Sequence, residues 1–192
     1  MNKKESEILI ARIEKWYAKL PNYFIYNKLP FEAKFGWSKE KVSFKDRLNL
    51  EYKPIKEGDE WGNKWESAWF HLKANMPSEW RGKQIASELD FSGEGLVYDN
   101  RGNEIQGITN GAIWDPNFRR TRVIFGKNII SDLKIELWVE AAANSLFGVH
   151  TDPDVKEDSP KKHGWFDAKV EKMKVGIFDE ELWHLYLDVR IL

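Results

Sequence analysis

The stretch Trp61–Gly107, WGNKWESAWFHLKANMPSEWRGKQIASELDFSGEGLVYDNRGNEIQG, decides the fold. Apolar residues alternate with polar ones from Phe70 to Met76 and again from Ile85 to Phe91, which is the period of a strand with one buried face. A turn at 77–82 separates these two predicted strands. The sequence DNRG at 99–102 then supplies turn chemistry for a hairpin into residues 104–106. The stretch therefore predicts antiparallel sheet.

Three further segments outside this stretch carry strand patterns. Apolar residues occupy most even positions of 42–52 and the odd positions of 133–139, so each segment predicts a strand with one buried face. In the last segment, 168–177, the apolar parity changes after Val170, which an extra residue in a β-bulge would explain. Short strands separated by Gly, Pro and Asp turns predict a mainly β fold, an antiparallel jelly-roll sandwich.

Helical patterns occur at the two ends of the chain. Residues 4–20 have apolar side chains at helical spacing and predict an amphipathic helix that ends at Pro21 and docks on another surface. Residues 21–41 are rich in aromatic side chains without a clean period, which predicts an irregular segment. At the other end Asp179 can cap a helix, and Phe178 can pack on Trp183 across its first turn.

The predicted C-terminal helix has an apolar ridge that runs to the last residue without a capping Gly or Asn. The ridge consists of Leu182, Trp183, Leu185, Tyr186, Val189 and Leu192. We expect protein outside this chain to cover the ridge, and the chain to be an excised part of a longer protein. The resulting division is a helix and irregular segment at 1–41, a sandwich at 42–178 and the start of a connecting helix at 179–192.

Composition limits the classes of function. The chain has 192 residues with 42% hydrophobic side chains, which suits one folded domain and excludes disorder. Its 30 basic and 31 acidic residues give a net charge of −1, so neither nucleic acid nor an anionic membrane is an expected partner. The absence of cysteine excludes disulfides, and we find no signal peptide or membrane-spanning segment, so we expect a soluble, cytoplasmic protein.

Several motifs together resemble a known family. They are WESAWFHL (65–72), MPSEWRGK (76–83), LDFSGEGLVYDNRGNEIQGIT (89–109), LWVEAAANSLFG (137–148) and LWHLYLDVRIL (182–192). In this order and spacing they are similar to the N-terminal β-sandwich domain of α-mannosidases of glycoside hydrolase family 38, over roughly residues 60–192. The resemblance implies a galactose-binding-like jelly roll that precedes a catalytic barrel, which here is absent.

The same resemblance implies an enzyme that removes terminal α-linked mannose with zinc and with retention of configuration. In the family the zinc ion and the carboxylate nucleophile belong to the barrel. This chain contains His150-Thr151-Asp152, a match to a His-x-Asp zinc motif, but the segment is rich in Pro and Asp and the other histidines are dispersed. We therefore predict no catalytic residue and no metal ligand in this chain, and a zinc ion in the missing catalytic domain.

The predicted partners are the chain's own catalytic domain, mannose-containing glycans as substrates of the whole enzyme, and a second copy of the protein in a homo-oligomer. An alternative hypothesis is an independent carbohydrate-binding module, with Trp114, Asp115 and Glu94 as a speculative sugar site, since exposed Trp faces stack on sugar rings. A third hypothesis is a protein that serves only as a scaffold for oligomer assembly. The basic residues Arg119, Arg120 and Arg122 are interpreted as a solvated strand edge.

Overall fold

The computed structural model describes residues 3–63, 66–109, 120–126, 130, 132–143 and 169–191. The helical elements are α1 (Lys3–Tyr17), η1 (Leu20–Tyr23), η2 (Arg47–Asn49), η3 (Ser78–Trp80) and α3 (Glu180–Ile191). The strands are β1 (Ile25–Pro30), β2 (Glu32–Ser38), β3 (Tyr52–Pro54), β4 (Ser67–Asn75), β5 (Ile85–Asp90), β6 (Glu94–Asp99), β7 (Glu104–Thr109), β8 (Arg122–Ile124), β9 (Lys134–Ala142) and β10 (Lys172–Phe178).

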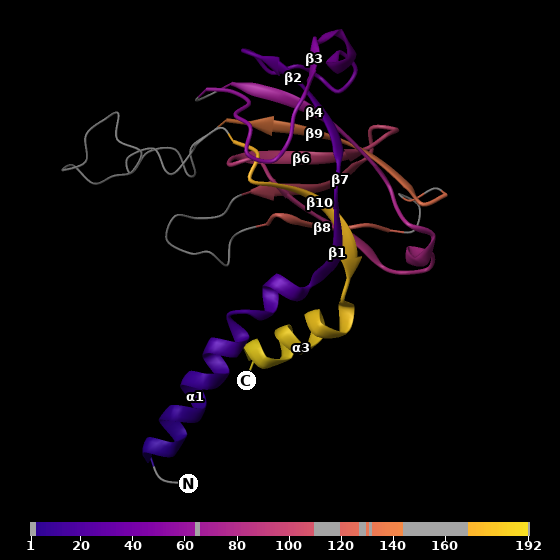
Figure 1. Ribbon diagram of the computed structural model, residues 1–192. Coiled ribbons are helices and arrows are strands. Elements are labelled where there is room, and N and C mark those ends of the chain that lie inside the picture. Colours follow the sequence, from indigo (N-terminus) through magenta and orange to yellow (C-terminus); the bar gives the residue numbers. More distant parts are fainter. Residues whose placement is uncertain are drawn as a thin grey trace, which may run out of the picture.

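These strands form two antiparallel sheets that face each other (Figure 1). One sheet has the order β1-β10-β5-β8 and the other has the order β3-β2-β4-β9-β6-β7. The chain changes sheet repeatedly, because β5, β8 and β10 lie in the first sheet while β4, β6, β7 and β9 lie in the second. The prediction of a mainly β, two-sheet antiparallel sandwich with a helix at each end is confirmed.

The core lies between the two sheets. Phe70 and Leu72 of β4 are opposite Val139 and Leu137 of β9, and all four side chains are fully buried. From the other sheet β5 and β10 contribute the alternating apolar positions that the sequence indicated. The predicted strands at 70–76, 85–91 and 133–139 therefore correspond to β4, β5 and β9, and the predicted hairpin corresponds to β6 and β7.

The predicted strand at 42–52 is wrong, except for Tyr52 at the start of β3. Residues 42–50 instead form an irregular cover on the outer face of the six-stranded sheet. The side chains of Val42, Phe44 and Leu50 pack on a second cluster made by Trp69, Tyr98 and Trp138, and the Trp69 indole donates a 2.8 Å hydrogen bond to the Val42 carbonyl. The even spacing of these three residues reflects this packing and not a strand, and Leu48 is 65% exposed.

The irregular segment predicted within 1–41 is also wrong in part, because residues 25–38 contain β1 and β2. Strand β2 pairs with β4 over seven residues, and β1 pairs with β10. The two-residue alternation of a strand was obscured in the sequence because β1 has an irregularity between Tyr26 and Leu29, where Asn27 takes φ 50°. The sandwich therefore begins near residue 25, before the predicted boundary at 42.

The start of α3 agrees with the prediction. The Asp179 carboxylate accepts a 2.9 Å hydrogen bond from the Leu182 backbone N–H, which is the geometry of a helix cap. The rings of Phe178 and Trp183 lie 6.4 Å apart across the first turn. The predicted β-bulge does not appear in β10, whose pairing with β5 is regular; the change of parity falls at Glu171 and Lys172, where the strand begins.

Candidate functional site

The sequence-predicted sugar site is described in part. Glu94 is the first residue of β6, where its Cα pairs with Thr109 of β7 and Ala142 of β9, and its side chain is exposed. Trp114 and Asp115 lie outside the described residues, as do His150 and Asp152. Whether Glu94, Trp114 and Asp115 come together stays a prediction.

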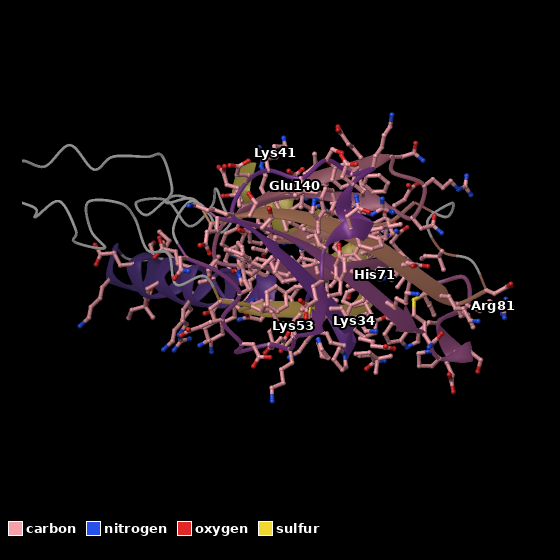
Figure 2. All side chains as sticks on the ribbon, turned by 90° about the horizontal axis from the view of Figure 1, so that it is seen from above. Lys34, Lys41, Lys53, His71, Arg81 and Glu140 are labelled. Carbon is pink, nitrogen blue, oxygen red and sulfur yellow. The ribbon has the colours of Figure 1, made fainter. Side chains whose placement is uncertain are left out.

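A second polar cluster, which the sequence did not indicate, lies on the outer face of the six-stranded sheet. His71 of β4 stacks on Trp138 of β9 with ring centroids 3.9 Å apart, and its Nε2 is 2.6 Å from Oε1 of Glu136 (Figure 2 labels His71). The Nζ of Lys73 is 3.3 Å from the same carboxylate oxygen. His71 and Trp138 meet because β4 and β9 pair in this register, so a cross-strand contact creates the cluster.

Burial sets the charge of this cluster. Burial lowers the pKa of His71, although the hydrogen bond to Glu136 opposes that shift. Burial also opposes ionisation of Glu136, but hydrogen bonds from His71 and Lys73 outweigh it and hold the pKa of Glu136 below its ordinary value. Near neutral pH a neutral His71 therefore donates its Nε2–H to an ionised Glu136.

This arrangement predicts a pH-dependent stability. Because the pKa of His71 in the folded chain lies below its ordinary value of 6.5, the unfolded chain binds the proton more readily. The stabilising contribution is therefore full above that ordinary value and is lost as pH falls through the lowered pKa. We expect the free energy of unfolding to fall as the pH decreases below about 7, with a slope of at most ~1.4 kcal/mol per pH unit.

The measurement is urea denaturation at several pH values in this range. His71→Gln keeps a hydrogen-bond donor but cannot titrate, so it should flatten the slope. The matched control His184→Gln removes an exposed imidazole from α3 and should leave the slope unchanged. An equal slope in the His71→Gln and unmodified chains would contradict the assignment.

The terminal helices meet in a compact aromatic cluster, which we call the anchoring cluster. Its buried members are Leu20, Phe24, Ile25, Ala86 and Phe178, with Tyr17, Leu182, Trp183 and Tyr186 packed against them. The rings of Tyr17 and Tyr186 stack with centroids 4.3 Å apart. The rings of Phe24 and Trp183 are in an edge-to-face arrangement with centroids 5.2 Å apart. Leu182, Trp183 and Tyr186 of the predicted apolar ridge are thus covered within the chain, so the expectation that other protein covers the ridge is wrong for these three residues. Leu185 remains 44% exposed.

Arg122 belongs to the anchoring cluster and not to a solvated edge, as the sequence had suggested. Its guanidinium carbon lies 4.3 Å from the ring centroid of Trp183 and 4.6 Å from that of Phe24. Burial lowers its pKa, and the neighbouring Glu88 acts in the opposite direction. The guanidinium therefore connects β8 to both terminal segments through cation–π contacts. The alternation of residues along β8 alone could not reveal these contacts.

One face of α1 is apolar and exposed. Leu9, Ile13 and Trp16 follow each other at helical spacing and are 44%, 53% and 47% exposed. Figure 1 shows α1 in indigo extending from the sandwich, with α3 beside its C-terminal part. The amphipathic helix was predicted correctly, but the surface on which it should dock is not provided by the part of the chain that the structure describes. We call Leu9, Ile13 and Trp16 the α1 face.

The part of the chain that the structure describes has neither a membrane-spanning helix nor a cluster of metal ligands. Its helices include no segment long and apolar enough to cross a membrane. Within the same residues, no group of three or more His, Cys, Asp or Glu side chains is placed to hold a metal ion.

Comparisons with known proteins agree on one family. A family model described as "Alpha-mannosidase, jelly roll domain" matches residues 29–174. α-Mannosidase G of Dictyostelium discoideum is 28% identical over 200 aligned residues, which cover 98% of this chain and 18% of that protein. α-Mannosidase 2C1 of Homo sapiens is 22% identical over 155 residues, which cover 80% of this chain and 14% of that protein. The chain thus spans less than a fifth of the length of these relatives.

Solved structures of β-glucuronidase from Ruminococcus gnavus are more distant matches. The complex with uronic deoxynojirimycin has a TM-score of 0.49 and 17% identity, covering 81% of this chain and 29% of that one. The complex with D-glucaro 1,5-lactone has a TM-score of 0.48 and 17% identity, covering 80% of this chain and 29% of that one.

Proposed function

Because the chain belongs to the family of α-mannosidase jelly-roll domains, we propose that it is a non-catalytic domain of an enzyme that hydrolyses terminal α-linked mannose. The observation that carries the proposal is the family match over residues 29–174. We therefore place the zinc ion and the carboxylate nucleophile in a catalytic part outside this chain.

We propose that the α1 face docks on that catalytic part of the same protein. Apolar side chains in this arrangement lose contact with water when a partner covers them. This burial favours docking by about 25 cal/mol per Å² of apolar area buried. The anchoring cluster supports this role, because Tyr17 stacks on Tyr186 and so fixes the last turn of α1 to α3 and to the sandwich. A covering partner would thereby hold the whole sandwich in a defined position.

The test uses the full-length protein that contains this chain. Ile13→Glu places a charge in the α1 face and should accelerate loss of hydrolysis of p-nitrophenyl α-D-mannopyranoside on heating. The matched control Ala11→Glu adds the same charge to an exposed position on the opposite side of α1 and should behave like the unmodified protein. In the 192-residue chain alone, neither variant should change the melting temperature, because both positions are exposed.

Two outcomes would overturn the proposal. Turnover of the mannoside by the 192-residue chain alone would show that it is catalytic. Absence of α-mannosidase activity in the full-length protein, after loading with zinc, would refute the parent activity. If Ile13→Glu behaves like Ala11→Glu in the full-length protein, the enzyme assignment stands and the α1 face is not the docking surface.

The remaining expectations from the sequence are proposals of the same kind. We propose a cytoplasmic enzyme that acts on mannose-containing glycans and assembles as a homo-oligomer. Carbohydrate binding by the domain itself is a second candidate function, supported by the exposed position of Glu94 at the start of β6. A glycan titration of the chain with Glu94→Gln as the variant tests it, and unchanged binding in that variant would exclude Glu94 from a sugar site.

A further inference from the structure

A cavity of about 540 Å³ lies where η3 leads into β5. Its walls come from the turn at 81–84, the turn before β9 and the first residue of α3. Figure 2 places Arg81, one of its lining residues, at the end of the sandwich away from α1. The volume falls in the range of small-molecule sites, about 300–1,000 Å³.

The cavity is lined by two sets of side chains, one apolar and one polar, and we call the polar set its rim. The apolar lining residues are Met76, Trp80, Ile85, Phe125, Ile130 and Leu133. Four of these six side chains are nearly inaccessible in the fold as a whole, and Trp80 among them is 5% exposed. The polar lining residues are Arg81, Lys83, Gln84, Asp132 and Glu180. A lining of apolar side chains with a few polar groups is the usual composition of a site that binds a small organic molecule.

The four charged rim residues do not neutralise each other directly. Within the described part of the chain, no salt bridge joins Arg81 or Lys83 to Asp132 or Glu180. Two cations and two anions give the rim no net charge, so it favours a neutral ligand over an anion or a cation. Hydroxyl groups suit such a rim, because each can donate to a carboxylate and accept from a guanidinium or an ammonium.

Backbone strain is concentrated at this cavity. Asp132 and Leu133 are consecutive residues in the left-handed region, with φ of 47° and 60°. This conformation is uncommon for an aspartate and costly for a leucine. The Leu133 carbonyl accepts a 2.7 Å hydrogen bond from the Met76 N–H, which holds the strained turn against the end of β4. Strained residues held in this way cluster at ligand sites.

We infer that this cavity binds a neutral polyhydroxylated ring, such as one pyranose unit of a glycan. The apolar lining residues receive the C–H faces of the ring, and the charged lining residues receive its hydroxyls. This site is separate from the predicted one at Glu94, because β6 begins at the opposite end of the strands from the start of β9. The choice of mannosides as probes rests on the proposed function, but the site's chemistry does not.

The test is a titration of the 192-residue chain with methyl α-D-mannopyranoside, followed by protein NMR. We expect saturable, millimolar binding with the largest shift at the Trp80 indole. Arg81→Met and Asp132→Asn each remove a charged hydrogen-bonding group from the rim and should weaken binding about tenfold. Asn tolerates the left-handed backbone at 132. The control Arg101→Met removes an exposed cation from the turn between β6 and β7 and should leave binding unchanged.

Three outcomes would overturn the inference. They are the absence of saturation by methyl mannoside, glucoside and galactoside up to about 50 mM, equal binding by Arg81→Met and the unmodified chain, and preferential binding of glucuronate or inorganic phosphate. None of them bears on hydrolysis of mannosides by the full-length protein, so failure of this site is distinguishable from failure of the proposed function.

Discussion

Replacing Phe70 with alanine is expected to lower the free energy of unfolding by about 3–5 kcal/mol, the usual cost of removing a buried aromatic ring. Phe70 is fully buried at the centre of the core. Its ring centroid lies 4.2 Å from that of Phe91, 5.5 Å from that of Trp61 and 6.0 Å from that of Phe35. Alanine would leave a cavity on which three aromatic rings, held by separate backbone segments, cannot close.

The measurement for Phe70 is urea denaturation, with the change read from the midpoint at constant slope. The control Tyr23→Ala removes a ring that is 61% exposed and should change the free energy of unfolding by less than about 0.5 kcal/mol. Phe70→Leu keeps much of the volume and should lose less than Phe70→Ala, which provides a measurable variant if the alanine chain does not fold. A loss below about 1 kcal/mol for Phe70→Ala would contradict the position of this ring in the core.

Gly176→Ala is expected to destabilise the fold by about 1–3 kcal/mol, because a methyl group has no space there. A Cβ at Gly176 would lie 2.6 Å from Cγ2 of Ile25 and 2.7 Å from the backbone oxygen of Tyr26. The backbone oxygen cannot rotate away, so β1 would have to move from β10. Ile25 belongs to the anchoring cluster, and its displacement would also loosen the contact between α3 and η1.

Denaturation of Gly176→Ala is best compared with Gly62→Ala. At Gly62 the nearest atom to an added Cβ is 3.5 Å away on the Glu66 side chain, which is an ordinary van der Waals distance, so the change should be small. Tryptophan fluorescence gives a second readout, since Trp183 and Phe24 separate if the anchoring cluster loosens. Equal stability of the two variants would show that β1 and β10 are less closely packed than the structure indicates.

The sequence predicted those elements that repeat a pattern locally. Strands β4, β5 and β9 have apolar residues at most alternate positions, and the Asp99–Gly102 turn joins adjacent strands, so a window of a few residues contains the needed information. The start of α3 was also predictable, because Asp179 caps a backbone N–H only three residues away.

The errors arose where the side-chain environment comes from distant parts of the chain. Strand β2 pairs with β4, more than thirty residues later, and its pattern is mixed because β2 is covered by β3 and Leu50 as well as by the core. Residues 42–50 look like a strand but cover Trp69, Tyr98 and Trp138. Arg122 looks solvated but lies over the rings of Phe24 and Trp183.

The candidate sites show the same division. The exposed apolar residues of α1 were recognisable from their spacing alone, as was the family through its motifs. The cavity at the end of the sandwich was not, because its lining joins Trp80, Phe125, Leu133 and Glu180 from four separate segments. The sequence by itself determined the β-rich class, the core strands and the terminal helices, since alternation and capping act over a few residues. Only the tertiary structure decided the sheet order, the cover at 42–50, the anchoring cluster and the cavity, because each depends on contacts between residues far apart in the chain.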